Sequence, residues 1–286
     1  MPALFANAVR PVTRREFALY QALVESELGI HLAESKQALV NARLTARIRE
    51  LGLATFSDYY ERATGSDREE LVRLLDAICT NETHFFREPH HFELLRETMV
   101  PRWLAEAEHG RRPKRVSLWS AGCSSGEEPY SLAMGLLAEL PADWSIDVLA
   151  SDVSSKALGR ARDAVYPMRR LLEIPAAYHQ PFLLRGIGER EGLFKIAPEV
   201  RRRVRFEHIN LVAPPRPQIG KFDLVSCRNV LIYFSAETRR RVVSWLCAHL
   251  ADLGYLWIGH AESLHDGTYP VRTVVPTVYR LANEIG

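Results

Sequence analysis

The first part of the chain carries hydrophobic residues at helical spacing. Apolar side chains recur three and four residues apart, which places them on one face of an α-helix. Three such stripes are visible, at Phe17–Leu28, Leu39–Leu51 and Leu71–Ile78. From Thr13 to about Glu108 we find no run with the two-residue period of a half-buried strand. The pattern therefore predicts an all-α N-terminal region.

After about Arg111 the pattern changes to short apolar runs separated by helical segments. The runs have strand length and lie at Val116–Ser120, Ile146–Asp152, Phe222–Cys227, Tyr255–Ile258 and Val274–Leu281. The helical segments lie at about Pro129–Leu140, Ser155–Val165 and Glu237–Leu250. Strands that alternate with long helices are typical of a parallel α/β sheet. The second part is therefore predicted to be an α/β domain.

One stretch within this second part has a different pattern, with short apolar runs and no long helical segment between them. Short strand-like runs lie at Phe182–Leu184, Leu193–Ile196 and Val204–Ile209, and the first turn contains Gly186, Gly188 and Gly192. Short runs joined by glycine turns indicate antiparallel hairpins. We therefore predict three parts. They are a helical domain over residues 1–88, a linker helix over 89–110, and an α/β domain over 111–286 with an antiparallel β-insert at about 181–209.

Length and composition narrow the class of protein. A chain of 286 residues is enough for about two domains. Its 47% hydrophobic and 25% charged residues are ordinary for a globular protein and exclude a disordered chain or a small disulfide scaffold. The net charge of +2 does not by itself indicate binding to nucleic acid or a membrane. Four sparse cysteines without CxxC spacing, and no signal peptide or membrane span, indicate a cytoplasmic protein.

Candidate chemistry starts in the loop after the first predicted strand, where Trp119–Ser131 reads WSAGCSSGEEPYS. Small residues allow a ligand to approach the backbone, and the helix that follows offers free N–H groups. Gly122 and Gly126 do not form the GxGxxG pattern of a nicotinamide-dependent oxidoreductase. They do flank a GxSxG match, so a serine hydrolase with Ser124 as nucleophile stays open. Against it, only helical sequence precedes this strand.

The acidic residues near this loop favour a positively charged ligand. Glu127 and Glu128 at a helix start would repel phosphate and attract a sulfonium or ammonium group. Asp152, at the end of the second strand, is placed to accept hydrogen bonds from ribose hydroxyls. Together these features indicate S-adenosylmethionine. The plainer alternative is that the two glutamates only stabilise the helix N-terminus.

The segment Cys79–Phe92 is dense in amide, hydroxyl, guanidinium and aromatic groups. It is either an inter-domain linker or part of a site. Its three histidines, His84, His90 and His91, lack the spacing and the cysteine partners of a zinc site. No metal is predicted.

Five motifs in a fixed order make the assignment more specific. They are TNETHFFRE (Thr80–Glu88), WSAGCSSGEEPYS (Trp119–Ser131), ASD (Ala150–Asp152), CRNVLIYF (Cys227–Phe234) and GHAESL (Gly259–Leu264). In this order the chain closely resembles the chemotaxis receptor glutamate O-methyltransferases, the CheR-type family, over nearly its whole length. The resemblance implies an all-α N-terminal domain, a Rossmann-like S-adenosylmethionine-dependent methyltransferase domain and a small antiparallel β-subdomain.

The resemblance also implies the roles of particular residues. Cofactor contacts are expected at Asn81, Thr83, Arg87, Glu128, Asp152, Asn210, Leu211, Arg228 and Asn229. Arg87 and Tyr233 are expected at the methyl-transfer centre. The substrate, a receptor glutamate, is ionised at pH 7 because its reference pKa is about 4.3. It therefore needs alignment rather than a general base, and Arg87 can align a carboxylate through a forked contact.

The implied partner is the cytoplasmic helical region of a chemoreceptor. Lys36, Arg43 and Arg47 share one face of a predicted helix, and family members dock receptors with this region. Gly186 and Gly188 lie in a hairpin that resembles the one with which some relatives bind a receptor tail by strand addition. A solvated basic face and an ordinary glycine turn are the alternatives.

Other functions stay open from the sequence. A nucleic-acid methyltransferase would use the basic helix on phosphates, and an adaptor could bind receptor tails without catalysis. We expect a monomer with no nucleic-acid partner and no membrane insertion.

Overall fold

The structure, a computed structural model, describes residues 9–79, 81–214, 219–264 and 269–282. It divides into two compact units. The smaller, helical unit comprises the described residues up to Cys79 together with Tyr233–Thr238. The larger unit comprises the remaining described residues from Asn81 onward. The segment Asn81–Glu88, predicted to close the N-terminal domain, therefore belongs to the larger unit.

The helical unit confirms the all-α prediction. Its helices are α1 (Arg14–Leu28), η1 (Glu34–Lys36), α2 (Gln37–Glu50), α3 (Phe56–Thr64) and α4 (Arg68–Ile78). Thr13 and Thr55 start α1 and α3 with capping boxes, and Asp67 caps α4. The apolar face of each α-helix is buried in the core of this unit. The fully buried side chains include Tyr20, Val24, Val40, Leu44, Ile48, Phe56 and Leu74.

A helical segment opens the larger unit. It consists of α5 (Pro89–Leu94), the π-helical turn η2 (Leu95–Met99) and α6 (Val100–Glu108). Pro101 has no N–H to donate to the preceding turn, which accounts for the π-helical turn just before it. Leu95, Met99 and Trp103 are buried in the main core. This segment, predicted as a linker, is thus an integral layer of the larger unit.

Seven strands form the main sheet, in the order β6-β2-β1-β7-β8-β10-β9. Their bounds are β1 (Arg115–Ala121), β2 (Ser145–Asp152), β6 (Val204–His208), β7 (Phe222–Cys227), β8 (Leu250–Ile258), β9 (Val271–Val275) and β10 (Val278–Leu281). The first five in this order run parallel, as the sequence predicted, and β10 and β9 are antiparallel. The single final strand predicted at Val274–Leu281 is wrong. It is a hairpin that turns at Thr277, whose φ is 67°.

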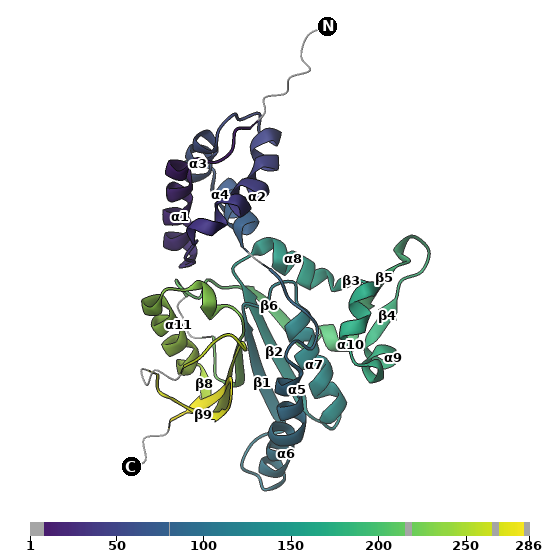
Figure 1. Ribbon diagram of the computed structural model, residues 1–286. Helices are drawn as coiled ribbons and strands as arrows, with labels where there is room; N and C mark the ends of the chain where they lie inside the picture. The colour runs from purple at the N-terminus through teal and green to yellow at the C-terminus, as the bar shows by residue number, and fades with distance from the viewer. Residues whose placement is uncertain (1–8, 80, 215–218, 265–268, 283–286) are drawn as a thin grey trace. The chain divides into compact units, whose positions relative to one another are not determined.

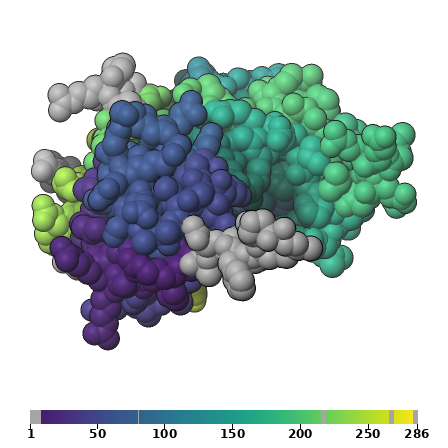
Figure 2. Space-filling model, turned by 90° about the horizontal axis from the view of Figure 1, so that it is seen from above, coloured from purple at the N-terminus to yellow at the C-terminus, as the bar shows by residue number. Residues whose placement is uncertain are grey.

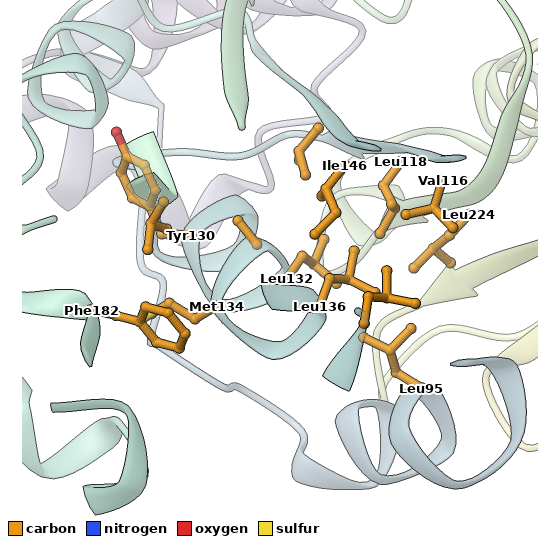
Figure 3. Close-up of a cluster of buried hydrophobic side chains, with 14 of the residues drawn as sticks. Leu95, Val116, Leu118, Tyr130, Leu132, Met134, Leu136, Ile146, Phe182 and Leu224 are labelled. Carbon is orange, nitrogen blue, oxygen red and sulfur yellow. The ribbon is translucent and has the colours of Figure 1, made fainter. Parts of the chain in front are cut away.

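Helices cover both faces of this sheet (Figure 1). On one face, Leu132 and Leu136 of α7 (Glu127–Glu139) point toward Val116 and Leu118 of β1 (Figure 3). On the other, Trp119 meets Trp245 of α11 (Ala236–Ala248) edge to face, with ring centroids 5.0 Å apart. Because successive strand side chains alternate between faces, these contacts define a doubly wound α/β layer.

A three-stranded antiparallel sheet projects from the larger unit (Figures 1 and 2). Its order is β3-β5-β4, with β3 (Val165–Pro167), β4 (Leu183–Arg185) and β5 (Leu193–Ile196). Between β3 and β4 lie η3 (Met168–Glu173), η4 (Ala176–Tyr178) and α9 (His179–Phe182), and η5 (Gly188–Arg190) lies between β4 and β5. The connection α8 (Ser155–Asp163) precedes β3, and α10 (Pro198–Arg201) follows β5.

The predicted insert at about 181–209 therefore needs two corrections. Val204–Ile209 contributes β6, which pairs in parallel with β2 of the main sheet. The third strand of the small sheet is Val165–Pro167, which pairs with Leu193–Lys195. Of its three residues, only Val165 had been assigned from the sequence, as the end of a helix. Local pattern cannot distinguish these cases, because the partner of a short strand is chosen by tertiary packing.

Candidate active site

The candidate site lies where the parallel strands β2, β1 and β7 end. Their carboxyl ends meet at one edge of the sheet, the usual ligand position in open α/β folds. The loop after β1 folds back so that the N–H groups of Gly122 and Cys123 both donate to the Ser151 carbonyl, at 2.7 and 2.9 Å. A Cβ at Gly122 would lie 2.5 Å from Val230 Cγ2, so this turn admits only glycine.

Asp152 fixes the loop and the next helix at once. Its two carboxylate oxygens accept hydrogen bonds from the N–H groups of Ser124 and Ser154, each at 2.8 Å. Ser154 in turn caps α8 through its hydroxyl. The carboxylate that the sequence predicted to bind a ribose is thus held rigidly at the end of β2.

The two glutamates at the start of α7 have different environments. Glu127 is 1% exposed and accepts hydrogen bonds from the Ser125 hydroxyl at 3.0 and 2.8 Å. Burial raises the pKa of this carboxyl above its ordinary value, and the Ser125 hydrogen bond only partly offsets the shift. Glu128 instead faces the sheet edge, where it accepts a 2.6 Å hydrogen bond from Ser120. Of the pair, Glu128 is the one placed at the candidate site.

Arg228, just after β7, connects three segments of the site. Its Nη1 lies 3.2 Å from Glu128 Oε2, and its Nη2 lies 3.3 Å from Glu88 Oε2. The Nη2 atom also donates to the Arg87 carbonyl. The side chain is only 2% exposed. A buried guanidinium between two carboxylates is strongly held, because neither charge is left uncompensated.

The segment Asn81–Glu88 packs along the same edge. The Asn81 carbonyl accepts a 3.0 Å hydrogen bond from the Ser124 hydroxyl, and its side-chain amide lies 3.4 Å from Ser154 Oγ. The Thr83 carbonyl accepts a 2.6 Å hydrogen bond from Arg170. Arg87 follows two residues after the buried Phe85. Asn81 is therefore brought to the ends of β1 and β2. The Thr83 carbonyl lies beside Arg170 of η3, and the Arg87 carbonyl lies beside Arg228 after β7.

Asn210 and Leu211 reach the same edge from the neighbouring strand. They follow β6, and the N–H of Ile209 donates to the Asp152 carbonyl at 3.1 Å. The Asn210 side chain accepts a hydrogen bond from the Val212 N–H at 3.0 Å, and Leu211 is 8% exposed. Asn210 and Leu211 thus follow β6 beside the end of β2, where Asp152 lies. The cofactor roles of the nine residues stay predictions.

Glu262 is a residue of this region to which sequence reasoning gave no role. Its carboxylate accepts hydrogen bonds from the N–H groups of Asn229, Gly259 and Ile232, at 3.0, 2.5 and 3.2 Å. Burial raises its pKa although these backbone hydrogen bonds oppose the shift. Asn229 has a positive φ of 59°, and Glu262 holds that turn in place. The only sequence signal was its position in the GHAESL motif.

Tyr233 falls in the helical unit, apart from Arg87 in the unit assignment. It ends η6 (Leu231–Tyr233), and its carbonyl accepts a 2.8 Å hydrogen bond from the His31 N–H. An isolated bridge between Ile30 and Phe234 continues this pairing. The meeting of Arg87 and Tyr233 at a methyl-transfer centre stays a prediction.

The basic residues of α2 differ from the expected docking face. Arg43 donates to the carbonyls of Ala77, Ile78 and Cys79 at the end of α4, at 3.3, 2.5 and 2.9 Å. Arg47 forks onto Glu70, which is 1% exposed, with contacts of 2.9 and 2.6 Å.

These contacts occupy the guanidiniums of Arg43 and Arg47 inside the helical unit. The Arg47 side chain is still 28% exposed, and the docking role of these two residues stays a prediction. Lys36 is exposed and stays available.

The histidines near the site have structural partners. His91 is fully buried, with Nε2 2.8 Å from Thr277 Oγ1 and Nδ1 3.5 Å from Glu88 Oε2. Burial, with the nearby charges of Arg228 and His90, lowers the pKa of His91 to about 2. Glu88, His90 and His91 are close enough to hold an ion. The guanidinium of Arg228 beside Glu88 would repel a cation, and we propose no metal there.

The hydrolase alternative gains no support. The Ser124 hydroxyl donates to the Asn81 carbonyl rather than to a histidine. Asp223 is an acid that follows this loop in the sequence and could have completed a triad. It lies instead near the opposite end of β7, where it binds Arg112 at 2.9 Å and the Ser117 N–H.

Comparison with known proteins agrees with this architecture. Two family profiles match the chain. One, the CheR methyltransferase SAM binding domain, covers residues 81–279, and the other, the CheR methyltransferase all-alpha domain, covers residues 15–79. The boundary between the profiles coincides with the first boundary between the two structural units, although Tyr233–Thr238 lies within the second profile and belongs to the helical unit. The fold and the site thus define an S-adenosylmethionine-dependent methyltransferase.

Relatives of similar length extend the comparison. Chemotaxis protein methyltransferase 2 of Pseudomonas aeruginosa is 39% identical over 280 residues, which cover 96% of each chain. The chemotaxis protein methyltransferase of Borreliella burgdorferi is 33% identical over 94% of this chain and 95% of its own. That of Escherichia coli is 34% identical over 94% of this chain and 91% of its own. The chain belongs to the CheR methyltransferase family.

Two further observations concern the setting of the protein. All four cysteines are free thiols. Within the described parts of the chain, no helix is both long and apolar enough to cross a lipid bilayer.

Proposed function

We propose that this protein transfers a methyl group from S-adenosylmethionine to glutamate side chains of chemoreceptors, which forms glutamate methyl esters. Membership of the CheR family supports the reaction, and the names of the relatives support a role in chemotaxis. The observation that carries the proposal is the gathering of Asp152, Glu128, Arg228 and the segment Asn81–Glu88 at one sheet edge. The cytoplasmic location and the monomeric state stay predictions.

Buried polar atoms at this edge fit the amino-acid end of S-adenosylmethionine. Arg228 Nε and Asn229 Oδ1 are buried and have no hydrogen-bond partner within the described structure. Unpaired buried groups are costly, so they favour a ligand that satisfies them. Arg228 Nε would donate to the methionine carboxylate, and Asn229 Oδ1 would accept from the ammonium group.

The remaining cofactor contacts follow from the order of the strands. Asp152 at the end of β2 would accept from the ribose hydroxyls. Asn210 and Leu211, after the neighbouring β6, would line the adenine region. Asn81 and Thr83 would close the site from the segment before α5.

The chain's own contribution to the chemistry would be alignment. When bound, S-adenosylmethionine supplies an electrophilic methyl group on a sulfonium. The glutamate carboxylate needs no general base, because it is already ionised at pH 7. Arg87 would orient its oxygens, and Tyr233 would complete the centre with its hydroxyl. One C–O bond forms, the C–S bond breaks with its electron pair leaving on sulfur, and the receptor loses one negative charge.

The small sheet has a feature that suits binding of a receptor tail. In the order β3-β5-β4, strand β4 is an edge, so its outer backbone groups are open to an added strand. The turn beside β4 requires glycine at two positions. A Cβ at Gly186 would lie 2.0 Å from the Arg190 carbonyl oxygen, and Gly188 has a φ of 56°. Ile187, between them, is 84% exposed.

Two measurements test the proposed function. Calorimetric titration should show binding of S-adenosylmethionine and S-adenosylhomocysteine, and a methyl-labelled cofactor should transfer label to a chemoreceptor fragment in a base-labile form. Binding of neither cofactor form would overturn the cofactor assignment. Base-stable label, or transfer to nucleic acid instead, would overturn the assignment of a carboxylate substrate.

A further inference from the structure

A cavity of about 840 Å³ lies at the opposite end of the main sheet from the candidate active site. Its wall includes Arg115, Val204 and Phe222, which are the first residues of β1, β6 and β7. Because these strands are parallel, their first residues lie at the edge opposite Asp152. Helix α6 closes one side with Arg102 and Trp103. All of these residues belong to the larger unit.

The wall of this cavity has a strong excess of positive charge. Its acidic residues are Glu106, Asp147 and Asp223. Its basic residues are Arg102, Arg111, Arg112, Arg115, Arg202, Arg203, Arg205 and Lys221. Eight cationic and three acidic side chains leave an excess of five positive charges, whereas the whole chain carries only +2. Such a concentration in one concave wall attracts anions.

The three carboxylates are already occupied by part of the basic set. Asp223 binds Arg112 at 2.9 Å, Asp147 binds Arg115 at 2.6 Å, and Glu106 binds Arg102 at 2.7 Å. The Lys221 ammonium donates to two backbone carbonyls. No acidic group of the wall is therefore left to neutralise the other arginines, of which Arg205 pairs with Glu207 outside the wall at 2.9 Å.

Three guanidiniums of the wall are unengaged. Across the described ranges, neither an ion pair nor a side-chain hydrogen bond involves Arg111, Arg202 or Arg203. Beside them, Arg112 stacks over Trp103 with its Cζ 5.4 Å from the ring centroid, and its buried Nε has no partner. The cavity thus presents free, forked donors beside an orphaned buried one.

We propose that this cavity binds a small ligand with two or more adjacent phosphate groups, such as a nucleotide or an inorganic polyphosphate. Guanidinium forks match phosphate oxygens in pairs, and seven of the eight cations are arginines. The volume lies within the roughly 300–1,000 Å³ of small-ligand pockets. Ile219 and Leu253 add an apolar wall beside the charges, which a nucleoside would contact.

Calorimetry on the full chain tests the proposal, with ATP and tripolyphosphate as separate probes at about 0.15 M salt, where exposed charges are screened. We expect saturable binding of at least one probe with one site per chain. Tighter binding of ATP would indicate a nucleotide site, and equal binding would indicate recognition of the phosphates alone. The triple variant Arg111→Gln, Arg202→Gln and Arg203→Gln should weaken binding by about tenfold or more.

A matched control separates a built site from general charge attraction. Arg160→Gln, Arg169→Gln and Arg190→Gln remove the same charge from exposed positions outside the cavity and should leave binding unchanged. Retained S-adenosylhomocysteine binding and an unchanged unfolding temperature would show that both variants are folded.

Four results would overturn the proposal. They are binding of neither probe, equal weakening in both variants, displacement of ATP by S-adenosylhomocysteine, and binding of polyglutamate in place of the phosphate probes.

Discussion

Arg228 and Glu128 are a hundred positions apart in the chain, yet the Arg228 Nη1 lies 3.2 Å from the Glu128 Oε2. This contact joins the end of β7 to the first turn of α7, and the second arm of the guanidinium reaches Glu88. Three motifs that are separate in sequence thereby become one surface at the carboxyl edge. The first prediction follows from this pairing.

Glu128→Ala should weaken S-adenosylmethionine binding by about tenfold or more, because the buried Arg228 loses one of its two carboxylate partners and shifts. Calorimetric titration measures the change. Glu127→Gln is the matched control, since Glu127 is buried, its pKa is raised and a neutral amide can still accept from Ser125. An equal loss of affinity in both variants would show that the two glutamates only stabilise the N-terminus of α7 and that Glu128 has no separate role in cofactor binding.

Glu262→Ala should lower the free energy of unfolding by about 3 kcal/mol or more. Each buried N–H left without its acceptor costs about 1–3 kcal/mol, and three N–H groups share this carboxylate. Glu262→Gln should lose less, because its amide oxygen can still accept. Urea denaturation measures both variants. If the alanine variant were as stable as the wild-type protein, the Asn229 turn would not depend on Glu262.

Tyr233→Phe should keep cofactor affinity and lose methyl transfer by about a hundredfold, because small errors of alignment have effects of that size. Calorimetry gives the affinity, and transfer of a labelled methyl group to a receptor fragment gives the rate. Tyr60→Phe, on α3, removes a hydroxyl elsewhere in the helical unit and serves as the control. Full activity of the Tyr233 variant would remove this residue from the methyl-transfer centre.

Arg47→Met should destabilise the helical unit by about 2 kcal/mol. Glu70 is 1% exposed and would keep a charge without its forked partner. The cost is below the about 3–5 kcal/mol of a fully buried pair because Arg47 is itself partly exposed. Adding Glu70→Gln should restore part of the loss, while Arg49→Met on the exposed side of α2 should change stability by less than about 0.5 kcal/mol.

The same contacts affect how receptor docking can be tested. Charge reversal at Arg43 and Arg47 would remove their contacts with α4 and Glu70 as well as alter the surface charge. Lys36→Glu is the cleaner change, because Lys36 is exposed. If receptor methylation falls in this variant at constant cofactor affinity, the docking role is supported. Unchanged methylation would indicate that the basic face is only a solvated surface with no role in docking.

The free energy of unfolding should fall at acidic pH because the Glu16 carboxylate becomes protonated. Burial alone would raise its pKa, but hydrogen bonds from Thr13, Arg10 and Ser57 outweigh burial and lower the pKa from 4.5 to about 2. A lowered folded-state pKa stabilises the protein above pH 4.5, and this stabilisation is lost as the pH falls from about 4.5 to about 2. In denaturation at several pH values, the stability difference between the wild-type protein and Glu16→Gln should therefore shrink over this range. A constant difference would contradict the assignment.

The features predicted correctly are those with a local periodic signal. The stripes of α1, α2 and α4 and the apolar runs of β1, β2, β7 and β8 locate the core because each repeats its pattern several times. The ends of the parallel strands then fix the candidate site, since Asp152 is the last residue of one such run and Arg228 directly follows another.

The errors arose where a partner distant in sequence decides the outcome. The pattern of Val204–Ile209 suits either sheet, and only pairing with β2 selects the large one. The turn at Thr277 has a positive φ without a glycine to announce it. A helical wheel places Arg43 and Arg47 on one face but does not show that α4 occupies that face. Glu262, a single buried acid, has no periodicity at all.

The short exchange at Tyr233–Thr238 has a consequence for protein engineering. The polypeptide passes from the helical unit to the larger one and returns for the six residues Tyr233–Thr238 before it leaves again. Of these six, Tyr233 and Phe234 pair with His31 and Ile30. A clone that ends at Cys79 or starts at Asn81 would therefore sever native pairing, although both cuts fall at a family boundary. A chimera between two relatives should therefore exchange the first 79 residues and the Tyr233–Thr238 segment together, because both belong to the same structural unit.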